Sequence, residues 1–178
     1  RDPRWGRGQE TYGEDPYLTG RLGVAFVKGL QGDDPKYLKV VATPKHYAVH
    51  SGPEKERHRM NIKINDKDLF ETYLPHFKEC VVEGNAQSVM CAYNRVNGVP
   101  ACASSRLLQD LLRKEWGFNG YIVSDCGAIL DFNRPLRHKF TNRFYKSAAS
   151  GLKNGCDLNC GMIYRWLPIA YKKGEIIM

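Results

Sequence analysis

Tyr121-Ile-Val-Ser-Asp125 is the stretch of sequence on which the fold and the candidate site both depend. This short apolar run is entered through Gly120 and left through Cys126-Gly127, a pattern that predicts a buried β-strand over residues 121–125. The strand delivers a carboxylate to its C-terminal end, where small neighbours leave room for a ligand. Asp and Ser after a strand are also ordinary helix caps and turn formers, so the pentapeptide alone leaves a structural role open.

Short apolar runs and longer helical patterns alternate along the rest of the chain. Asp15-Pro16 is typical of an N-cap followed by Pro at the first helical position, Asp66 is expected to cap a second helix, and Pro75 kinks or restarts it. In chain order the predicted elements are helix 16–31, strand 38–43, helix 66–81, strand 88–93, helix 104–116, strand 121–125, helix 144–153, strand 156–159 and helix 164–173, with a further strand starting in the last four residues. This alternation predicts right-handed βαβ units, a parallel sheet and the α/β class.

Polar residues follow the predicted strands, namely Lys45-His46, Tyr93, Asp125 and Asp157. In a (β/α)8 barrel the C-terminal ends of the strands and the loops after them build the active site, so these side chains are expected to converge. This convergence favours a functional role for Asp125. Only about four strands are predicted, whereas a barrel needs eight, so we expect residues 1–178 to be an incomplete portion of a (β/α)8 TIM-like barrel within a larger protein. A chain that starts with Arg1 rather than Met also fits an excised or processed piece.

Composition and charge narrow the function classes. The formal net charge is +8, but the Lys and Arg residues are scattered in short groups such as Lys172-Lys173, so nucleic-acid binding is not expected. No run approaches 18 uninterrupted apolar residues and no basic-then-apolar leader is visible, so neither a membrane span nor a signal peptide is expected. No GxGxxG or GxxxxGK(S/T) motif follows a predicted strand, which counts against nucleotide binding.

The 6 cysteines do not form a metal-binding pattern. They lack the paired CxxC spacing of a zinc site, and the spacing of Cys156 and Cys160 has no second pair to complete it. Free buried thiols are therefore the default expectation, with one or two disulfides if the protein is exported.

Taken together, five motifs resemble glycoside hydrolase family 3. They run through nearly the whole chain in the family's order, and the first and fourth are specific. The motifs are Arg1-Asp-Pro-Arg-Trp-Gly-Arg-Gly-Gln-Glu-Thr-Tyr-Gly-Glu-Asp-Pro16, Lys45-His46-Tyr47, Val89-Met-Cys-Ala-Tyr-Asn94, Val123-Ser-Asp-Cys126 and Asp157-Leu-Asn-Cys-Gly161. The resemblance implies an enzyme that hydrolyses β-linked oligosaccharides or other glycosides from the non-reducing end, with retention of configuration.

The resemblance also implies roles for single residues. In family members the aspartate of the Ser-Asp motif is the nucleophile that forms a covalent glycosyl-enzyme, and here that residue is Asp125. The substrate-binding residues fall on Arg7, Lys45, His46, Arg57, Met90 and Tyr93. Cationic and imidazole groups donate hydrogen bonds to sugar hydroxyls, and contacts that strengthen at the oxocarbenium-like transition state raise the rate as well as the affinity. No metal or organic cofactor is implied, since two carboxylates and water suffice.

A retaining mechanism needs a second carboxyl group, the general acid/base, about 5–5.5 Å from the nucleophile. The resemblance places that residue in a following second domain, which lies outside this chain, so the fragment alone is expected to be inactive. The local carboxylates Glu10, Glu14, Glu54 and Asp157 are interpreted as structural hydrogen-bonding groups. Residues 49–58 match poorly with the Asp-Ser-His loop of family members that act on N-acetylglucosaminides.

Cys126, directly after Asp125, favours a β-xylosidase used in xylan degradation, because xylosidase-like members resemble this chain there whereas many family β-glucosidases carry Trp. Cys126 and Cys160 would lie at the ends of neighbouring strands, so this pair is the expected disulfide. A β-glucosidase and a non-catalytic carbohydrate-binding or structural fragment remain as alternatives. The expected partners are the remaining barrel strands and the second domain, and family habit places the parent protein in the periplasm or outside the cell.

Overall fold

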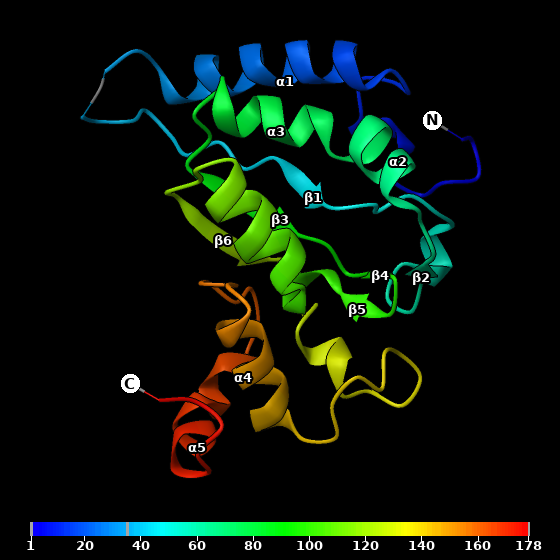
Figure 1. Ribbon diagram of the computed structural model, residues 1–178, viewed down its shortest axis with the longest axis vertical. Helices are drawn as coiled ribbons and strands as arrows, with labels where there is room; N and C mark the ends of the chain where they lie inside the picture. Colours follow the sequence, from blue (N-terminus) through cyan, green and yellow to red (C-terminus); the bar gives the residue numbers. More distant parts are fainter. Residues whose placement is uncertain (1, 35, 178) are drawn as a thin grey trace.

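A three-stranded parallel β-sheet runs through the structure, a computed structural model that describes residues 2–34 and 36–177 (Figure 1). Its strands, in spatial order, are β1 (Lys45–Tyr47), β3 (Ser88–Cys91) and β6 (Tyr121–Ser124). At the other edge of β6, Leu158 forms a single parallel bridge to Val123. The parallel pairing and the helices between the strands confirm the α/β class expected from the sequence.

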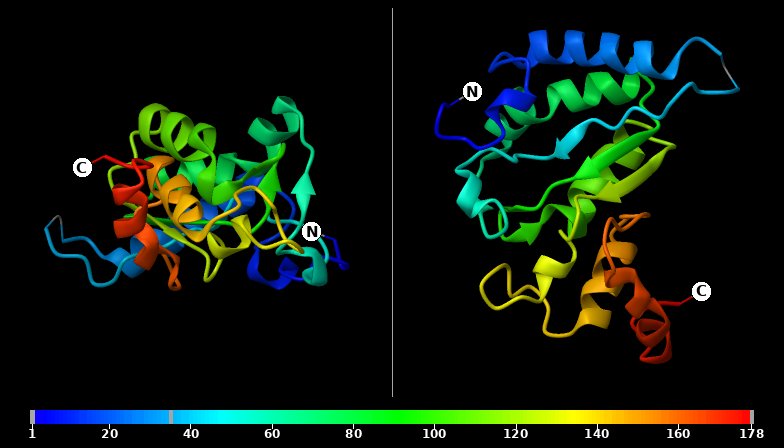
Figure 2. Two further views of the ribbon diagram at one scale, coloured as in Figure 1. Left: turned by 90° about the horizontal axis from the view of Figure 1, so that it is seen from below. Right: turned by 180° about the vertical axis from the view of Figure 1, so that it is seen from behind.

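Helices connect the strands of this sheet. The longer ones and their neighbours are α1 (Pro16–Gln31), α2 (Asp66–Asp68), the π-helical turn η3 (Leu69–Tyr73), α3 (Pro75–Val82), the π-helix η5 (Arg106–Glu115), α4 (Phe144–Lys153), η7 (Ile163–Trp166) and α5 (Leu167–Lys172). Short 3-10 turns are η1 (Gly8–Glu10), η2 (Glu54–Glu56), η4 (Ala101–Ala103) and η6 (Leu130–Phe132). Helices α1 and α3 pack together at one end of the molecule, and α4 packs with α5 at the other (Figures 1 and 2). None of the helices in the described residues is both long and apolar enough to cross a membrane.

Polar side chains and prolines set the starts of these helices. Asp15 caps α1, because its Oδ1 accepts a hydrogen bond from the Tyr17 amide at 2.8 Å. The cap expected at Asp66 is instead Asn65, whose side chain accepts from the Asp68 amide at 2.8 Å. Pro75 starts the separate helix α3, in agreement with the restart expected there.

The hydrophobic core lies between one face of the sheet and the helices α3 and η5. Val89 and Ile122, which are neighbours across β3 and β6, are both 0% exposed. Apolar side chains of the predicted helix 104–116 are buried in the same cluster: Leu107, Leu108, Leu111, Leu112 and Trp116. Because side chains alternate along a strand, Met90 and Val123 lie on the opposite face, where both are only partly buried.

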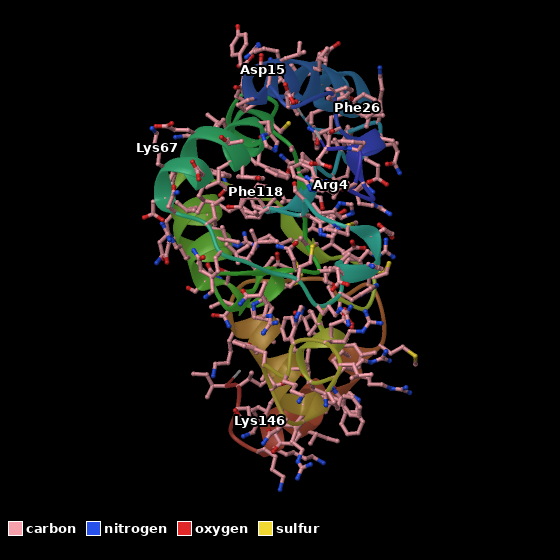
Figure 3. All side chains as sticks on the ribbon, turned by 90° about the vertical axis from the view of Figure 1, so that its right-hand side faces the viewer. Arg4, Asp15, Phe26, Lys67, Phe118 and Lys146 are labelled. Atoms are coloured by element: carbon pink, nitrogen blue, oxygen red, sulfur yellow. A yellow bond between two sulfur atoms is a disulfide. The ribbon has the colours of Figure 1, made fainter. Side chains whose placement is uncertain are left out.

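Basic side chains belong to separate regions of the surface. Arg4, Lys67 and Lys146 come from the N-terminal loop, α2 and α4, and all three have exposed surface (Figure 3). Phe118, labelled in the same view, is an apolar side chain of the core and is 4% exposed. This spread agrees with the scatter of Lys and Arg along the chain.

The apolar residues whose spacing predicted α1 do not form its buried face. Leu18, Leu22, Phe26 and Leu30 are between 37% and 59% exposed. The face that packs on α3 contains Val24 and Val27, which are 2% and 3% exposed. Periodicity therefore located the helix without identifying the side that packs.

A second sheet forms from segments that lie outside the predicted strands. It consists of β2 (Asn61–Ile62), β4 (Arg95–Val96) and β5 (Val99–Pro100). The hairpin between β4 and β5 turns at Asn97 and Gly98, with φ of 50° and 94°, a backbone conformation that Asn and Gly tolerate best. The Asn97 side chain accepts from the Ile64 amide at 3.0 Å and donates to the Ile64 carbonyl at 2.9 Å, which attaches the hairpin to the segment after β2.

Two predicted strands are wrong and a third is reduced to one bridge. Residues 38–43 form no strand, because the backbone of β3 instead hydrogen-bonds to the chain at Pro44 and Tyr47. The strand expected in the last four residues is absent from 175–177, where Ile177 is 94% exposed. The segment 156–159 has a single bridge, at Leu158, and the amides of Asp157 and Leu158 both donate to the Ile122 carbonyl. Arg1 of the first motif and Met178 lie outside the described residues.

Tyr47 provides a test of the packing between sheet and helix. It is 0% exposed, and its hydroxyl donates to the Leu107 carbonyl at 3.0 Å. We expect Tyr47→Phe to lower the free energy of unfolding by about 1 kcal/mol or more, because the buried carbonyl loses its partner. Urea unfolding measures the change. The control is Tyr37→Phe at a side chain that is 67% exposed, which should change stability little; equal effects of the two substitutions would contradict the assignment.

Candidate active site

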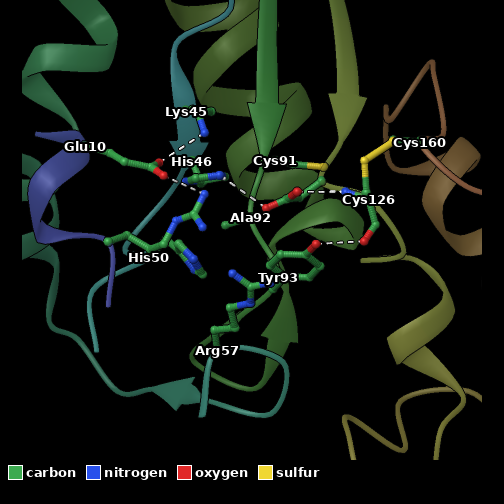
Figure 4. A network of polar contacts seen from close by, with 12 residues as sticks. Glu10, Lys45, His46, His50, Arg57, Cys91, Ala92, Tyr93, Cys126 and Cys160 are labelled. Atoms are coloured by element: carbon green, nitrogen blue, oxygen red, sulfur yellow. Dashed lines mark hydrogen bonds and ion pairs between the residues drawn. A yellow bond between two sulfur atoms is a disulfide. The ribbon is translucent and has the colours of Figure 1, made fainter. Parts of the chain in front are cut away.

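Side chains from several segments meet where the strands of the parallel sheet end. His46 lies in β1, Tyr93 two residues after β3, and Asp125 directly after β6. Parallel strands place their carboxyl ends at one edge of the sheet, and Figure 4 shows His46 and Tyr93 there. Arg7, in the N-terminal loop, lies at this edge beside Lys45 and His46. Arg57, the first residue after η2, lies there beside Tyr93.

Asp125 is held by the backbone of two strands and by one side chain. Its amide donates to the Cys91 carbonyl at 3.0 Å, which continues the pairing of β3 and β6 by one residue. Its Oδ1 accepts from the Cys126 amide at 2.8 Å, and its Oδ2 lies 3.3 Å from His46 Nε2. The Asp125 side chain is 14% exposed, so the carboxylate is oriented but still reachable.

Glu10 holds two cationic side chains together. Its Oε1 lies 2.8 Å from a terminal nitrogen of Arg7, and its Oε2 lies 3.0 Å from Lys45 Nζ (Figure 4). Within the described residues the buried Arg7 Nε has no hydrogen-bond partner. The arrangement gives the site fixed positive groups beside the neutral imidazole of His46.

Tyr93 is fixed at both its hydroxyl and its ring. The hydroxyl donates to the Cys126 carbonyl at 2.7 Å, and the Arg57 guanidinium lies 5.2 Å from the ring centroid, within cation–π range. Burial raises the pKa of Tyr93 to about 12, and the negative charge of Asp125 adds to the shift. The phenol therefore stays protonated near neutral pH.

Burial keeps the histidines of the site neutral. Burial, together with the nearby positive charges of Lys45 and Arg7, lowers the pKa of His46 to about 3. Burial also lowers the pKa of His50, against the effect of its hydrogen bond with Asn94 Oδ1 at 3.1 Å. The positive charge of the site at neutral pH therefore comes from arginine and lysine.

Two disulfides lie close to these residues. Cys126, the residue after Asp125, is joined to Cys160, the pair expected from the sequence (Figure 4). A second disulfide, Cys91–Cys102, ties β3 to η4 and was not expected as a pair. The default expectation of free buried thiols holds for Cys80 and Cys156, and burial raises the pKa of the Cys156 thiol to about 12.

A cavity of about 190 Å³ opens beside His46. Its lining includes Arg7, Lys45, His46 and Glu14, but not Asp125. His46 thus lines the cavity and also contacts Asp125 through Nε2. In the part of the chain that the structure describes, no group of three or more His, Cys, Asp and Glu side chains is placed to hold a metal ion.

Met90 lies on the strand next to the one that leads to Asp125, whereas Asp157 lies away from Asp125. Met90 pairs with Lys45 and Val123 inside the sheet, on the face opposite the helices. The expectation that Asp157 converges with the site is wrong, because Asp157 Oδ2 accepts from the amide of Ile122 near the start of β6 at 2.7 Å. The Asp157 amide also donates to the Ile122 carbonyl at 2.9 Å, so Asp157 lies level with the start of the strand.

A further carboxylate near the site, Asp131, was missed by sequence reasoning. Asp131 is 4% exposed, and its Oδ2 lies 2.7 Å from His58 Nδ1. The signal for it was a lone carboxylate within the apolar run Ala128–Phe132, six positions after Asp125. A buried charge needs a polar partner, which this sequence pattern alone does not name.

Comparison with known proteins identifies the family of this fold and site. The family model described as "Glycosyl hydrolase family 3 N terminal domain" matches residues 1–177. The chain is 51% identical over 178 residues to "Xylan 1,4-beta-xylosidase" of Xylanibacter ruminicola, covering 98% of this chain and 20% of that protein. It is 46% identical over 184 residues to "Beta-xylosidase/alpha-L-arabinofuranosidase 2" of Medicago sativa subsp. varia, covering 99% of this chain and 23% of that protein.

Solved structures agree with the sequence comparisons. An exo-β-xylosidase of the family, in complex with a xylobiose aziridine activity-based probe, superimposes with a TM-score of 0.94 and 38% identity over 99% of this chain and 24% of its own. A β-glucosidase from Erythrobacter marinus superimposes with a TM-score of 0.90 and 32% identity over 98% of this chain and 24% of its own. The chain therefore spans about a fifth to a quarter of the proteins it matches.

The burial of His76 generates a prediction about acid stability. Burial lowers the pKa of His76, which lines the cavity, to about 4, below the usual value of 6.5. Folding therefore favours the neutral form of His76. The stability that this preference gives the folded state is fully present above pH 6.5 and is lost as the pH falls toward 4. We expect the free energy of unfolding of His76→Phe to fall less steeply with acid than that of the parent, by at most about 1.4 kcal/mol per pH unit. Urea unfolding between pH 7 and pH 4 checks this, and identical slopes would refute it.

Proposed function

Because the chain belongs to glycoside hydrolase family 3, we propose that the whole protein hydrolyses β-linked glycosides at the non-reducing end through a covalent intermediate on Asp125. The observation that carries this proposal is the placement of Asp125. Its carboxylate is oriented by the Cys126 amide and by His46 and stays partly exposed. A nucleophile needs both properties, since it must be aimed and must reach the substrate.

The proposed reaction has two displacements. Asp125 Oδ2 or Oδ1 attacks the anomeric carbon while the bond to the leaving oxygen breaks and a general acid gives that oxygen a proton. The same group then takes a proton from water, and the water oxygen attacks the anomeric carbon, which releases the sugar and restores the carboxylate. Two inversions at one carbon give net retention.

We assign sugar binding to Arg7, Lys45, His46, Arg57 and Tyr93. Arg7 and Lys45 are supported by their ion pairs with Glu10, which limit their motion before the substrate arrives. Donors fixed in advance lose little entropy when hydroxyl groups bind, and contacts that shorten at the transition state increase the rate. Met90 remains a proposed wall residue, on the face of the sheet opposite the helices.

The general acid/base is proposed to come from a second domain of the whole protein. Within this chain Glu10 is paired with Lys45 and Arg7, Glu54 with Arg57, and Asp157 with Arg113. A carboxylate held by a cation is poorly suited to donate a proton, because the cation stabilises its ionised form. We therefore expect residues 1–178 alone to have negligible activity.

We infer that the chain is a portion of a (β/α)8 barrel. Support comes from the parallel order β1-β3-β6, the bridge at Leu158 and the helices that separate these strands. In the described residues β1 has a ladder partner only on its β3 side, so a preceding strand would complete the sheet there. The remaining strands and the second domain are the proposed partners of this chain.

A β-xylosidase is the proposed specificity, and a β-glucosidase is the second candidate. Two sequence relatives are named as xylosidases at 51% and 46% identity, whereas the β-glucosidase structure is 32% identical. The Cys126–Cys160 disulfide next to Asp125 occupies a position where many family β-glucosidases carry a tryptophan. A non-catalytic carbohydrate-binding role is the third candidate, and it fits the lack of an assigned acid/base in this chain.

The two disulfides support a location in the periplasm or outside the cell. Disulfides persist in oxidising compartments and are rare in reducing ones. The proposed role in xylan degradation also fits a location outside the cytoplasm, where the enzyme could contact the polymer.

Substitution of the nucleophile tests the mechanism. In the whole protein, Asp125→Asn should lower kcat/KM on an aryl xyloside at least about 1,000-fold, because an amide cannot form the glycosyl ester. The matched control is Asp110→Asn in η5, whose carboxylate is half exposed and paired with Lys114. A large loss in both variants, or in neither, would contradict the role of Asp125.

The choice of sugar is tested on the same protein. We expect a higher kcat/KM for an aryl β-xyloside than for the matching β-glucoside, because the two sequence relatives at 51% and 46% identity are named as xylosidases. A preference for the glucoside would promote the second candidate and leave the nucleophile assignment intact.

A further inference from the structure

Asp131, which is buried, and His58, which is partly buried, form a polar pair next to Arg57 and Tyr93, two of the proposed sugar-binding residues. Asp131 lies in η6 and is 4% exposed. Its Oδ2 lies 2.7 Å from His58 Nδ1, and its Oδ1 lies 3.9 Å from Arg137 Nε. A carboxylate this deeply buried costs free energy unless it is paired. The contact with His58 therefore stabilises the buried carboxylate of Asp131.

The contacts of His58 determine which ring nitrogen carries the proton. Arg57 Nε is a permanent donor, and it donates to His58 Nε2 at 3.3 Å. His58 Nε2 must therefore present a lone pair, which places the hydrogen on Nδ1, where the Asp131 carboxylate accepts it. Asp131 thus selects the His58 tautomer in which Nε2 can accept the hydrogen bond from Arg57.

His58 also contacts Tyr93, because their ring centroids lie 4.2 Å apart. Figure 4 shows Arg57 beside Tyr93, and the guanidinium lies 5.2 Å from the centroid of that ring. On its outer side Arg57 is paired with Glu54 at 2.6 Å. Arg57 is therefore held between an acidic group near solvent and the His58 acceptor near the core.

A histidine paired with an aspartate can also act as an acid or base in catalysis. The geometry here argues against that use, because His58 Nε2 is already occupied by Arg57 and Nδ1 by Asp131. Neither nitrogen is left to exchange a proton with a substrate.

We propose that Asp131 and His58 are positioning residues, which fix Arg57 over Tyr93 by selecting the His58 tautomer. The proposal rests on the proposed function, in which Arg57 and Tyr93 bind the sugar. It assigns a role to two residues that do not themselves touch the substrate.

Kinetics of the whole protein test the role. His58→Phe keeps a ring against Tyr93 but removes both hydrogen bonds, and Asp131→Leu removes the group that selects the tautomer. Each should lower kcat/KM on an aryl xyloside about 10-fold or more, mainly through KM, because a hydrogen bond to a charged group that orients a binding residue is lost. Asp131→Asn should restore most of the activity, since its amide oxygen still accepts from Nδ1. Arg137→Ala is the matched control, because it removes the distant partner of Asp131 and leaves His58 in place.

Crystal structures of the parent protein and of His58→Phe provide a readout that does not depend on activity. We expect the Arg57 guanidinium to leave the Tyr93 ring in the variant and to stay there in Arg137→Ala. If Arg57 keeps its place in His58→Phe, or if Asp131→Leu matches the parent in KM, the positioning role is refuted. If the parent shows the His58 contacts but hydrolyses neither xyloside nor glucoside, the proposed function fails while the positioning of Arg57 is judged from the structures.

Discussion

The pairing of β3 with β6 is the constraint on which the rest of the structure depends. It begins where Gly120 passes so close to the Gln87 carbonyl that a Cβ there would collide with it, and the Tyr121 amide donates to that carbonyl at 3.2 Å. It ends where the Asp125 amide donates to the Cys91 carbonyl at 3.0 Å. A parallel ladder fixes both strands in one register, so the residues that leave its carboxyl end are placed relative to each other before any side-chain contact forms.

The loop after β6 is secured from the side opposite β3. Ser124 is 0% exposed, and its hydroxyl accepts from the Cys160 amide and the Asn159 side chain, both at 3.1 Å. The disulfide between Cys126 and Cys160 closes the same connection covalently. Asp125 therefore sits between a backbone ladder and a cross-link, which limits its motion without covering its carboxylate. A carboxylate restrained in this way suits a reaction that depends on alignment.

Sequence reasoning succeeded where local chemistry determines structure. The bounds of α4 agree with the predicted 144–153, the strand before Asp125 lies where its apolar run indicated, and the Asp15-Pro16 start of α1 was correct. It failed where structure depends on distant partners. Residues 38–43 include Val40 and Val41, which favour a strand, but β3 pairs with Lys45–Tyr47 instead.

The candidate site shows the same division between local and distant signals. Asp125 and Tyr93 could be predicted as neighbours because they follow strands of one parallel sheet. His46 joins them from within β1, and not from the end of the predicted strand 38–43. The bridge from Glu10 to Lys45 and the pair of Asp131 with His58 join residues 35 and 73 positions apart, and no local pattern specifies such pairs. Asp157 was misplaced because the register of its short segment is decided by one bridge at Leu158.

Covalent labelling tests the central claim most directly. The whole protein is incubated with a 2-deoxy-2-fluoro xyloside that carries an activated leaving group, and the labelled peptide is identified by mass spectrometry. The fluorine slows both displacements, whereas the good leaving group needs little protonation, so the glycosyl-enzyme accumulates. The account predicts one added sugar, esterified to Asp125. A label on a different residue of an active enzyme would contradict it.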